Sequence, residues 1–329
     1  MTNPLPLRIF IALFYLALSV PAAAEDTPLL SIPLACTVGE TCFIQTYVDA
    51  DSSPAYRDYH CGALSYDDHR GTDFRLKSMA DLNAGVPVLA AADGVVRAVR
   101  DGMEDISVQI LGKQALQGRE AGNSVVIVHS KDWESQYAHL KKGSVAVQPG
   151  QTVKRGTVLG RVGLSGNSEF LHLHFEIRHK GKPVDPFVGL TAGDTCSLGK
   201  RPLWQADTLK KLPYIATGLI SAGFADHPSA PDEGLAVTLA ADAPALVFAV
   251  TVFGIQTDDE QKLDFFTPDG AVLVHQDKRI EKNMAQYHSF IGKKRPPALW
   301  PKGNYRAVYQ LLRKQQPIVN QAFSLRVGP

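Results

Sequence analysis

The segment 171–178 alternates strictly between apolar and polar side chains, and it constrains the fold more than any other stretch of the chain. Its apolar positions are Leu171, Leu173, Phe175 and Ile177, and its polar positions are His172, His174, Glu176 and Arg178. Because successive side chains of a strand point to opposite faces, this pattern predicts a half-buried strand. Its polar face then carries two imidazoles about 7 Å apart, which suits metal binding or proton transfer, whereas an isolated His-x-His is more often solvated.

The region from about residue 87 to residue 178 has the pattern of a series of short strands. Predicted strands cover 94–100, 124–129, 135–140 and 158–162, and turn sequences rich in Gly, Asp, Asn and Pro separate them. No amphipathic helix of normal length lies between these runs, so we expect an antiparallel sheet. Segment 101–122 is longer than a hairpin turn and is either a flap over a cleft or a mobile loop.

A second group of strand-like runs follows and predicts a β-sandwich-like module at the C-terminal end of the chain. These runs cover 235–239, 245–253, 262–266, 271–275, 305–312 and 322–327. This part of the sequence carries no evident cluster of His, Asp or Cys. We therefore expect it to position the protein or to bind a protein partner rather than to carry out chemistry.

The N-terminal residues 1–24 have the features of a cleavable secretory signal. Arg8 precedes an apolar run at 9–20 and the small residues Ala22-Ala23-Ala24, so we expect cleavage after Ala24. No other segment is long and apolar enough to cross a membrane, and we expect a periplasmic or secreted protein with no stable membrane span after cleavage. The net charge of +1, without a basic block, argues against nucleic acid as a partner.

The sequence contains four cysteines, Cys36, Cys42, Cys61 and Cys196, and none has the C-x-x-C spacing of a zinc or redox site. In an oxidising compartment, disulfides are the better interpretation, and three pairings are possible. Cys36 and Cys42 flank a turn-like segment centred on Gly39, so we expect them to form a bridge. Cys61 and Cys196 then form the second bridge.

A metal-ligand pattern occurs in His69-Arg70-Gly71-Thr72-Asp73-Phe74. Gly71 disfavours a helix, so His69 and Asp73 can turn toward one point from an extended or looped segment. With His174 they form a His, Asp, His set. Zinc binds nitrogen and oxygen ligands, and catalytic zinc sites use three protein ligands and leave the fourth position to water. Taken alone, His-x-x-x-Asp occurs often by chance and is equally typical of a polar loop.

A third pattern is Tyr137-Ala138-His139-Leu140. Read as a strand, it places Tyr137 and His139 on one face and the two apolar residues on the other. His139 is then another imidazole on a sheet. Alone, it is more often a hydrogen-bonded polar residue than a catalytic one.

Together, these patterns resemble those of the lysostaphin-type (M23) zinc metallopeptidases. The order His69-x-x-x-Asp73, Tyr137-Ala138-His139-Leu140 and His172-x-His174-Phe-Glu carries the resemblance, with glycine-rich sequences such as HRGTDF and QPGQTVKRGTVLG. It covers about residues 61–187 and does not extend to the C-terminal module. It implies a mainly β chain, with an antiparallel β-sheet metallopeptidase domain of the lysostaphin-like type that contains a narrow groove.

The resemblance also implies a role for each site residue. His69, Asp73 and His174 match the ligands of one Zn²⁺ per chain, and His139 and His172 match a pair of catalytic histidines that do not bind the metal. Either of this pair can act as the general base. Some relatives carry a tyrosine near the metal. Tyr66 is a candidate for this position, but the sequence does not fix its alignment with that tyrosine, so Tyr66 is not included in the predicted site.

The activity implied by the resemblance is that of a zinc metalloendopeptidase that hydrolyses peptide bonds in bacterial peptidoglycan. The alternative is a non-catalytic wall-binding or amidase-activating module on the same fold, and the presence of all five site residues argues against it. The expected parts are then a signal peptide at 1–24, an N-terminal segment with the Cys36/Cys42 loop at 25–60, an M23-like zinc peptidase domain at 61–198, and a β-sandwich-like module at 199–329.

Overall fold

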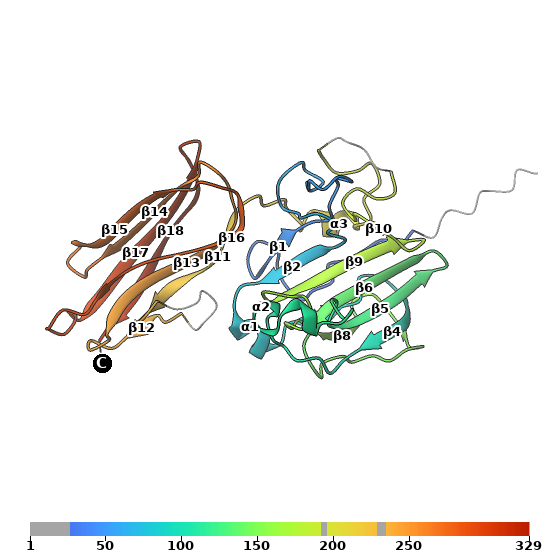
Figure 1. The fold of residues 1–329 in the computed structure, drawn as a ribbon, viewed down its shortest axis with the longest axis horizontal. Coiled ribbons are helices and arrows are strands. Elements are labelled where there is room, and N and C mark those ends of the chain that lie inside the picture. The colour runs from blue at the N-terminus through green and yellow to red at the C-terminus, as the bar shows by residue number, and fades with distance from the viewer. Residues whose placement is uncertain (1–26, 192–195, 229–234, 329) are drawn as a thin grey trace, which may run out of the picture.

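The computed structural model describes residues 27–191, 196–228 and 235–328 of the protein. The segment 1–24, with its expected cleavage site, lies outside these ranges. Two β-rich modules lie side by side, one built on an eight-stranded sheet and the other on two facing sheets (Figure 1). The expected mainly β, largely antiparallel fold is confirmed. None of the helices in the described ranges is both long enough and apolar enough to cross a membrane.

The larger sheet has the order β1-β2-β9-β6-β5-β4-β7, and β10 pairs with the outer part of β9. Its strands are β1 (Cys42–Thr46), β2 (Thr72–Leu76), β4 (Gly94–Arg100), β5 (Asn123–Ser130), β6 (Trp133–Leu140), β7 (Thr152–Val153), β9 (His172–His179) and β10 (Lys182–Val184). A two-stranded sheet is formed by β3 (Pro87–Leu89) and β8 (Val158–Arg161). The short helices are α1 (Met79–Ala84), α2 (Val108–Leu111), η1 (Lys113–Ala115) and α3 (Ala206–Leu209). The four strands predicted in this region are confirmed to within a few residues.

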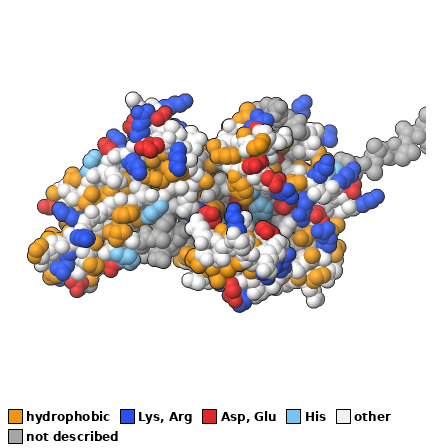
Figure 2. Space-filling model, in the orientation of Figure 1, with side chains coloured by type: hydrophobic (Ala, Val, Ile, Leu, Met, Phe, Trp, Pro, Cys, Tyr) orange, Lys and Arg blue, Asp and Glu red, His pale blue; other side chains and the backbone are white. Residues whose placement is uncertain are grey.

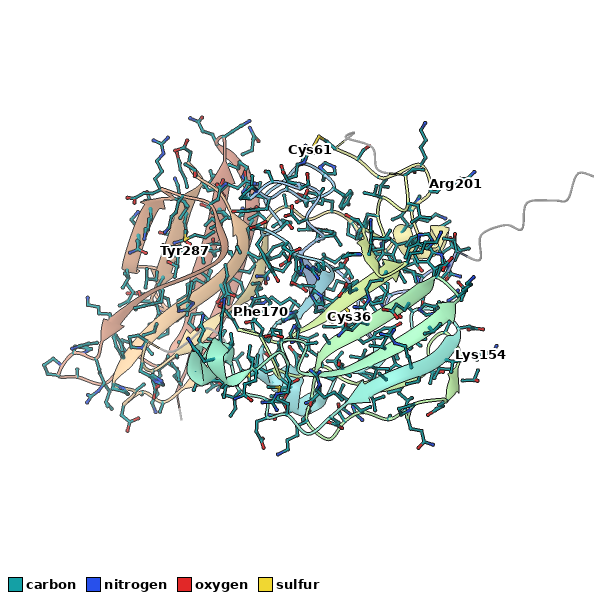
Figure 3. All side chains as sticks on the ribbon, turned by 45° about the vertical axis from the view of Figure 1, so that its right-hand side comes forward. Cys36, Cys61, Lys154, Phe170, Arg201 and Tyr287 are labelled. Atoms are coloured by element: carbon teal, nitrogen blue, oxygen red, sulfur yellow. A yellow bond between two sulfur atoms is a disulfide. The ribbon has the colours of Figure 1, made fainter. Side chains whose placement is uncertain are left out.

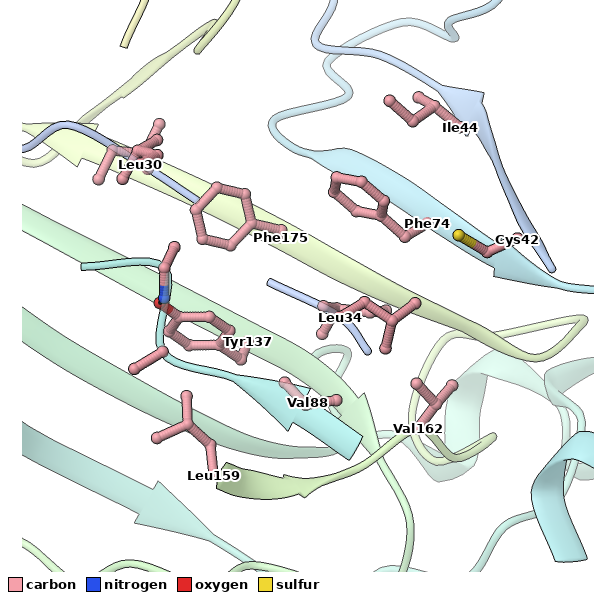
Figure 4. Close-up of a cluster of buried hydrophobic side chains, with 14 of the residues drawn as sticks. Leu30, Leu34, Cys42, Ile44, Phe74, Val88, Tyr137, Leu159, Val162 and Phe175 are labelled. Carbon is pink, nitrogen blue, oxygen red and sulfur yellow. The ribbon is translucent and has the colours of Figure 1, made fainter. Parts of the chain in front are cut away.

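The core of this module forms on one face of the sheet, where the alternating residues of β9 pack against neighbouring strands. Phe175 and Phe74 point into this core, and Tyr137 lies beneath them (Figure 4). The Tyr137 hydroxyl accepts a hydrogen bond of 2.8 Å from the backbone N–H of Ala91, so its polar end is satisfied in the apolar interior.

The opposite face of β9 is also largely covered, contrary to the expected half-buried strand. Loops around the sheet leave His172 only 5% exposed and Glu176 only 8% exposed. The pattern predicted the two faces correctly, but it carried no information about the loops that close over the polar one.

The C-terminal module is a sandwich of two sheets, as predicted. One has the order β11-β13-β16, and the other has the order β12-β18-β17-β14-β15. Their strands are β11 (Gly218–Ala225), β12 (Thr238–Leu239), β13 (Ala245–Ile255), β14 (Glu260–Phe266), β15 (Val272–Arg279), β16 (Met284–Lys294), β17 (Gly303–Arg313) and β18 (Gln316–Val327). Two strands, β11 and β16, were not predicted, and the expected strand at 235–239 is reduced to Thr238–Leu239.

The two modules share apolar contacts along the β1 edge of the larger sheet. The ring of Phe43 on β1 lies 5.3 Å from the ring of Phe253 on β13, measured between centroids. Leu203 and Trp204, which precede α3, are 2% exposed and belong to the core of the larger sheet. The connection between the modules is therefore part of the packed structure of the first module.

Segment 101–122 is ordered against the loop that precedes β9. It contains α2 and η1, and the N–H of Val108 donates to the carbonyl of Ser168. The N–H of Asn167 donates in turn to the carbonyl of Glu120. These bonds hold the segment against the loop that precedes β9.

Both expected disulfides are confirmed. Cys36 bonds Cys42, with a Cα–Cα distance of 6.0 Å, and Cys61 bonds Cys196, with a Cα–Cα distance of 4.9 Å. The second bridge joins residues separated by 135 positions, whereas the first spans 6. A bridge lowers the entropy of the unfolded chain more when it closes a longer loop.

The loop lengths predict unequal losses of stability when each bridge is removed. Replacing both Cys61 and Cys196 by Ser is expected to lower the free energy of unfolding by about 5 kcal/mol, and the same change at Cys36 and Cys42 by about 2 kcal/mol. Urea unfolding of the two double variants measures the difference. Equal losses, or a larger loss for the short loop, would show that loop closure does not determine the stabilisation.

Candidate active site

The register between β2 and β9 brings two predicted site residues together. Asp73 is paired with His174 across the two strands. Directly opposed residues of an antiparallel pair lie on the same face, with their Cβ atoms about 5 Å apart. The Asp73 carboxylate therefore meets the His174 ring, with 2.8 Å between Oδ1 and Nδ1.

His69 joins this pair from the turn before β2. Its Nδ1 lies 2.7 Å from the carbonyl oxygen of Tyr47, and because a carbonyl only accepts, Nδ1 carries the proton. Its Nε2 points at the pair, 3.1 Å from Asp73 Oδ2 and 3.3 Å from His174 Nδ1. His69, Asp73 and His174 thus form a set of three side chains able to bind one metal ion.

Gly71 makes room for this set. A Cβ atom added at Gly71 would lie 2.6 Å from Cε1 of His174 and 2.8 Å from the carbonyl oxygen of Phe175. Neither contact is tolerated without a shift, so only glycine allows the turn to approach β9 this closely. The glycine that argued against a helix in the sequence therefore has a second role beside the metal-ligand set.

His139 reaches the site through a β-bulge, which corrects the expectation that it shares a face with Tyr137. Tyr137 is paired with Phe175 and lies in the core, whereas Ala138 is paired with His174 on the site face. Regular alternation would return His139 to the core face. Instead, the pairing of β5 with β6 shifts at this point, and His139 has a φ of +62°. Its ring centroid lies 5.9 Å from that of His174.

Buried polar groups hold this bulge in place. The side-chain amide of Asn123, which is completely buried, donates to the carbonyl of Leu140 at 3.0 Å. The hydroxyl of Ser165 donates to the same carbonyl at 2.7 Å, and the carbonyl of Ser165 accepts from Nδ1 of His139 at 2.8 Å. A left-handed conformation costs a residue other than glycine about 1–2 kcal/mol, and these hydrogen bonds stabilise it.

His172 lies beside His139, with 4.7 Å between their ring centroids. Nδ1 of His172 donates to the carbonyl of Phe170 at 2.9 Å and lies 3.1 Å from the Ser168 hydroxyl. Both His139 and His172 therefore present an unprotonated Nε2 away from these carbonyls. A pair of neutral imidazoles beside three potential metal ligands can accept and return protons.

Burial and charge determine the protonation states in this cluster. Burial, followed by the neighbouring His172 and His174, lowers the pKa of His139 well below its ordinary value. Burial also lowers the pKa of His172, partly offset by the Asp73 carboxylate. Asp73 is buried, which raises its pKa, but the surrounding imidazoles outweigh this and hold the pKa well below its ordinary value. At neutral pH, the site therefore has one carboxylate and two neutral imidazoles beside it.

The structure brings all five predicted site residues together. Figure 2 shows histidine atoms in a hollow of the larger module, between lobes that carry acidic and basic side chains. His60 and His129 lie elsewhere: the His60 ring stacks on Tyr214 with 4.4 Å between centroids, and His129 lies 2.8 Å from the hydroxyl of Ser135.

Tyr66, which was left outside the site, lies beside His69 with 4.4 Å between ring centroids. Partial desolvation, followed by the neighbouring Asp73 and Asp68 carboxylates, raises the pKa of its phenol although the residue is 52% exposed, so the phenol is protonated at neutral pH. Glu176 lies on the same strand, β9, as His172 and His174. It is 8% exposed, and its carboxylate lies 3.6 Å from the Arg178 guanidinium. The contact seen for Glu176 is thus an ion pair within the sheet face.

Sequence reasoning missed the groups that orient the imidazoles. Three of them are the backbone carbonyls of Tyr47, Ser165 and Phe170. A carbonyl leaves no mark in a sequence, because every residue has one. Asn123 offered the best signal, since an amide inside an apolar strand pattern is expected to have a specific partner.

The close approach at Gly71 predicts a specific defect. Changing Gly71 to Ala should push the His174 ring from its position and lower the affinity for a divalent metal ion by about ten- to a hundredfold. Competition with a chromophoric chelator measures the affinity. Gly328→Ala is the control, because a Cβ at that position meets open space. Wild-type affinity in Gly71→Ala would show that the close approach does not position His174.

Comparison with known proteins agrees with this geometry. The sequence model of peptidase family M23 matches residues 67–186. An uncharacterized metalloprotease of Haemophilus influenzae is 32% identical over 137 residues, which are 40% of this chain and 24% of that protein. The peptidoglycan DD-endopeptidase ShyA of Vibrio cholerae is 36% identical over 120 residues, which are 36% of this chain and 22% of that protein. The match thus spans about a quarter of the length of these relatives.

Among solved structures, a zinc-containing peptidase from Vibrio cholerae has 28% sequence identity and a TM-score of 0.28. The alignment covers 44% of this chain and 39% of that one. The family match lies entirely within the larger module and includes the five residues of the site. Over residues 67–186, the chain therefore carries a domain of peptidase family M23.

Proposed function

We propose that the protein is a zinc metalloendopeptidase that hydrolyses peptide bonds in bacterial peptidoglycan. The observation that carries the proposal is the convergence of His69, Asp73 and His174 on one point, with His139 and His172 beside it. The family match and the similarity to a protein named as a peptidoglycan endopeptidase support the substrate class.

The ligand set fits zinc in both chemistry and spacing. Zinc is bound by imidazole nitrogen and carboxylate oxygen at about 2.0–2.2 Å, so the ligand atoms of a tetrahedral site lie about 3.3 Å apart. In this structure, His69 Nε2 and His174 Nδ1 lie 3.3 Å apart; His174 Nδ1 is 2.8 Å from Oδ1 of Asp73, and His69 Nε2 is 3.1 Å from Oδ2. When bound, the metal acts as a Lewis acid that polarises the scissile carbonyl and acidifies water.

The residues of the chain provide proton transfer and orientation. Nε2 of His139 or of His172 accepts a proton from the attacking water, and the imidazolium formed in this way can then donate that proton to the leaving amine. Either ring can accept the proton at neutral pH because its lowered pKa keeps it neutral. The protonated phenol of Tyr66, a residue that is about half exposed, is a further donor near the ligand set.

The proposed place of action is outside the cytoplasm, in the periplasm or the medium. Two disulfides support this, because such bonds persist in oxidising compartments. The secretory features of residues 1–24 agree with it. An extracytoplasmic location gives the enzyme access to its proposed substrate.

Digestion of purified peptidoglycan tests the substrate class. The zinc-loaded protein is expected to release peptide fragments cut at amide bonds, which mass spectrometry of the products identifies. His172→Ala provides the matched control, because it removes one proton-transfer group and retains the metal ligands. A zinc-loaded, folded protein that cuts neither peptidoglycan nor isolated muropeptides would contradict the proposal and favour a non-catalytic wall-binding role.

Two variants of β9 separate metal binding from proton transfer. His174→Ala leaves two protein ligands, so zinc should be lost or weakly bound. His172→Ala should retain zinc while turnover falls by roughly two to four orders of magnitude. Zinc content and turnover are measured on each purified variant. Loss of zinc in His172→Ala with retention in His174→Ala would reverse the assignment.

A further inference from the structure

Arg75 is a buried charge beside the proposed catalytic pair, and the proposed chemistry does not use it. It lies on β2 directly opposite His172 of β9, so both side chains project from the same face of the sheet. Arg75 is only 1% exposed. A buried guanidinium is costly unless its donors are satisfied, so its partners indicate what it holds in place.

The first partner of Arg75 is the ring of Phe170. The guanidinium carbon lies 4.2 Å from the centroid of this ring, and the Phe170 ring lies 4.8 Å from the ring of His172. The carbonyl of Phe170 also accepts the Nδ1 proton of His172. Phe170 thus contacts His172 through both its ring and its backbone, and the Arg75 guanidinium lies over that ring.

Two hydrogen-bond acceptors of Arg75 come from different modules. Its Nη1 donates to Oε1 of Gln45 on β1 at 2.8 Å and to Oε1 of Gln286 on β16. Gln286 belongs to the C-terminal sandwich, outside the family match at 67–186. Figure 3 shows Phe170 on the side of the larger module that faces the sandwich, and Tyr287 is labelled on the sandwich. Arg75 therefore connects Gln286 of the C-terminal module to Phe170, and Phe170 contacts His172.

We propose that Arg75 is a positioning residue for His172 and that Gln286 of the C-terminal module fixes it. The proposal rests on the proposed peptidase function. Two amide oxygens at one Nη1 set the plane of the guanidinium, and that plane sets the stack on Phe170. Phe170 in turn fixes the carbonyl that orients the His172 ring. The sandwich thus completes the proton-transfer site without contacting substrate.

This arrangement predicts a defect in turnover without a defect in metal binding. Gln286→Ala removes one acceptor from Arg75 and leaves the ligand set untouched. A displacement of a catalytic group by about 1 Å can lower turnover by up to a hundredfold, and because Gln45 still holds Arg75, we expect about three- to tenfold. The Michaelis constant and the zinc content should stay at their wild-type values. Gln286→Glu, which retains an acceptor, should restore turnover.

The experiment uses the full chain and a readout that does not require activity. Histidine side-chain ¹⁵N signals are recorded on the metal-free protein, and those of His172 are identified by their absence in His172→Asn. Gln286→Ala is expected to shift the His172 signals and to leave those of His129 unchanged. Phe170→Leu breaks the stack from the other side and should shift the same signals. Gln276→Ala, an exposed glutamine of β15, is the matched control.

The outcomes separate this inference from the proposed function. Shifted His172 signals in Gln286→Ala and Phe170→Leu, with lowered turnover at constant zinc content, support it. His172 signals and turnover in Gln286→Ala that match those of Gln276→Ala overturn it, even if the wild-type protein is an active peptidase. A wild-type protein without activity overturns the proposed function instead, and the shift of the His172 signals still reports whether the modules are coupled.

Discussion

The pairing of β2 with β9 is the constraint on which the rest of the site depends. Its register places Asp73 opposite His174 and Arg75 opposite His172 on one face. A slip of one residue would send all four side chains into the core, because side chains alternate along a strand. The apolar residues on the other face, such as Phe74 and Phe175, prevent that slip by their burial. The core thus fixes the positions of the polar groups of the site.

Burial of the polar face gives these groups their chemical properties. Loops cover His139 and His172, and the resulting desolvation keeps both imidazoles neutral. Backbone carbonyls then determine which nitrogen of each ring carries the proton. The bulge gives His139 a left-handed backbone conformation. Asn123 and Ser165 stabilise it through hydrogen bonds to the surrounding backbone.

The sequence predicted the strands that carry the site because period-two alternation reports directly on burial of one face. The roles of His69, Asp73 and His174 followed from the resemblance to the M23 metallopeptidases, because His-x-x-x-Asp alone occurs often by chance. The face of the sheet on which His139 lies could not be predicted, because a bulge changes the face of one residue without changing the sequence pattern around it. β16 was missed because its sequence, MAQYHSFIGKK, does not alternate regularly between apolar and polar residues, and its Gln286 contacts Arg75 of the other module.

The central claim is that one zinc ion binds where the β2–β9 register and the turn at Gly71 converge. Anomalous diffraction at the zinc edge, on crystals of the zinc-loaded protein, tests this directly. We expect one strong peak at about 2.0–2.2 Å from His69 Nε2, an oxygen of Asp73 and His174 Nδ1. A peak bonded to His139 and His172 instead, or an ordered ligand set with no peak in zinc-loaded crystals, would contradict the account.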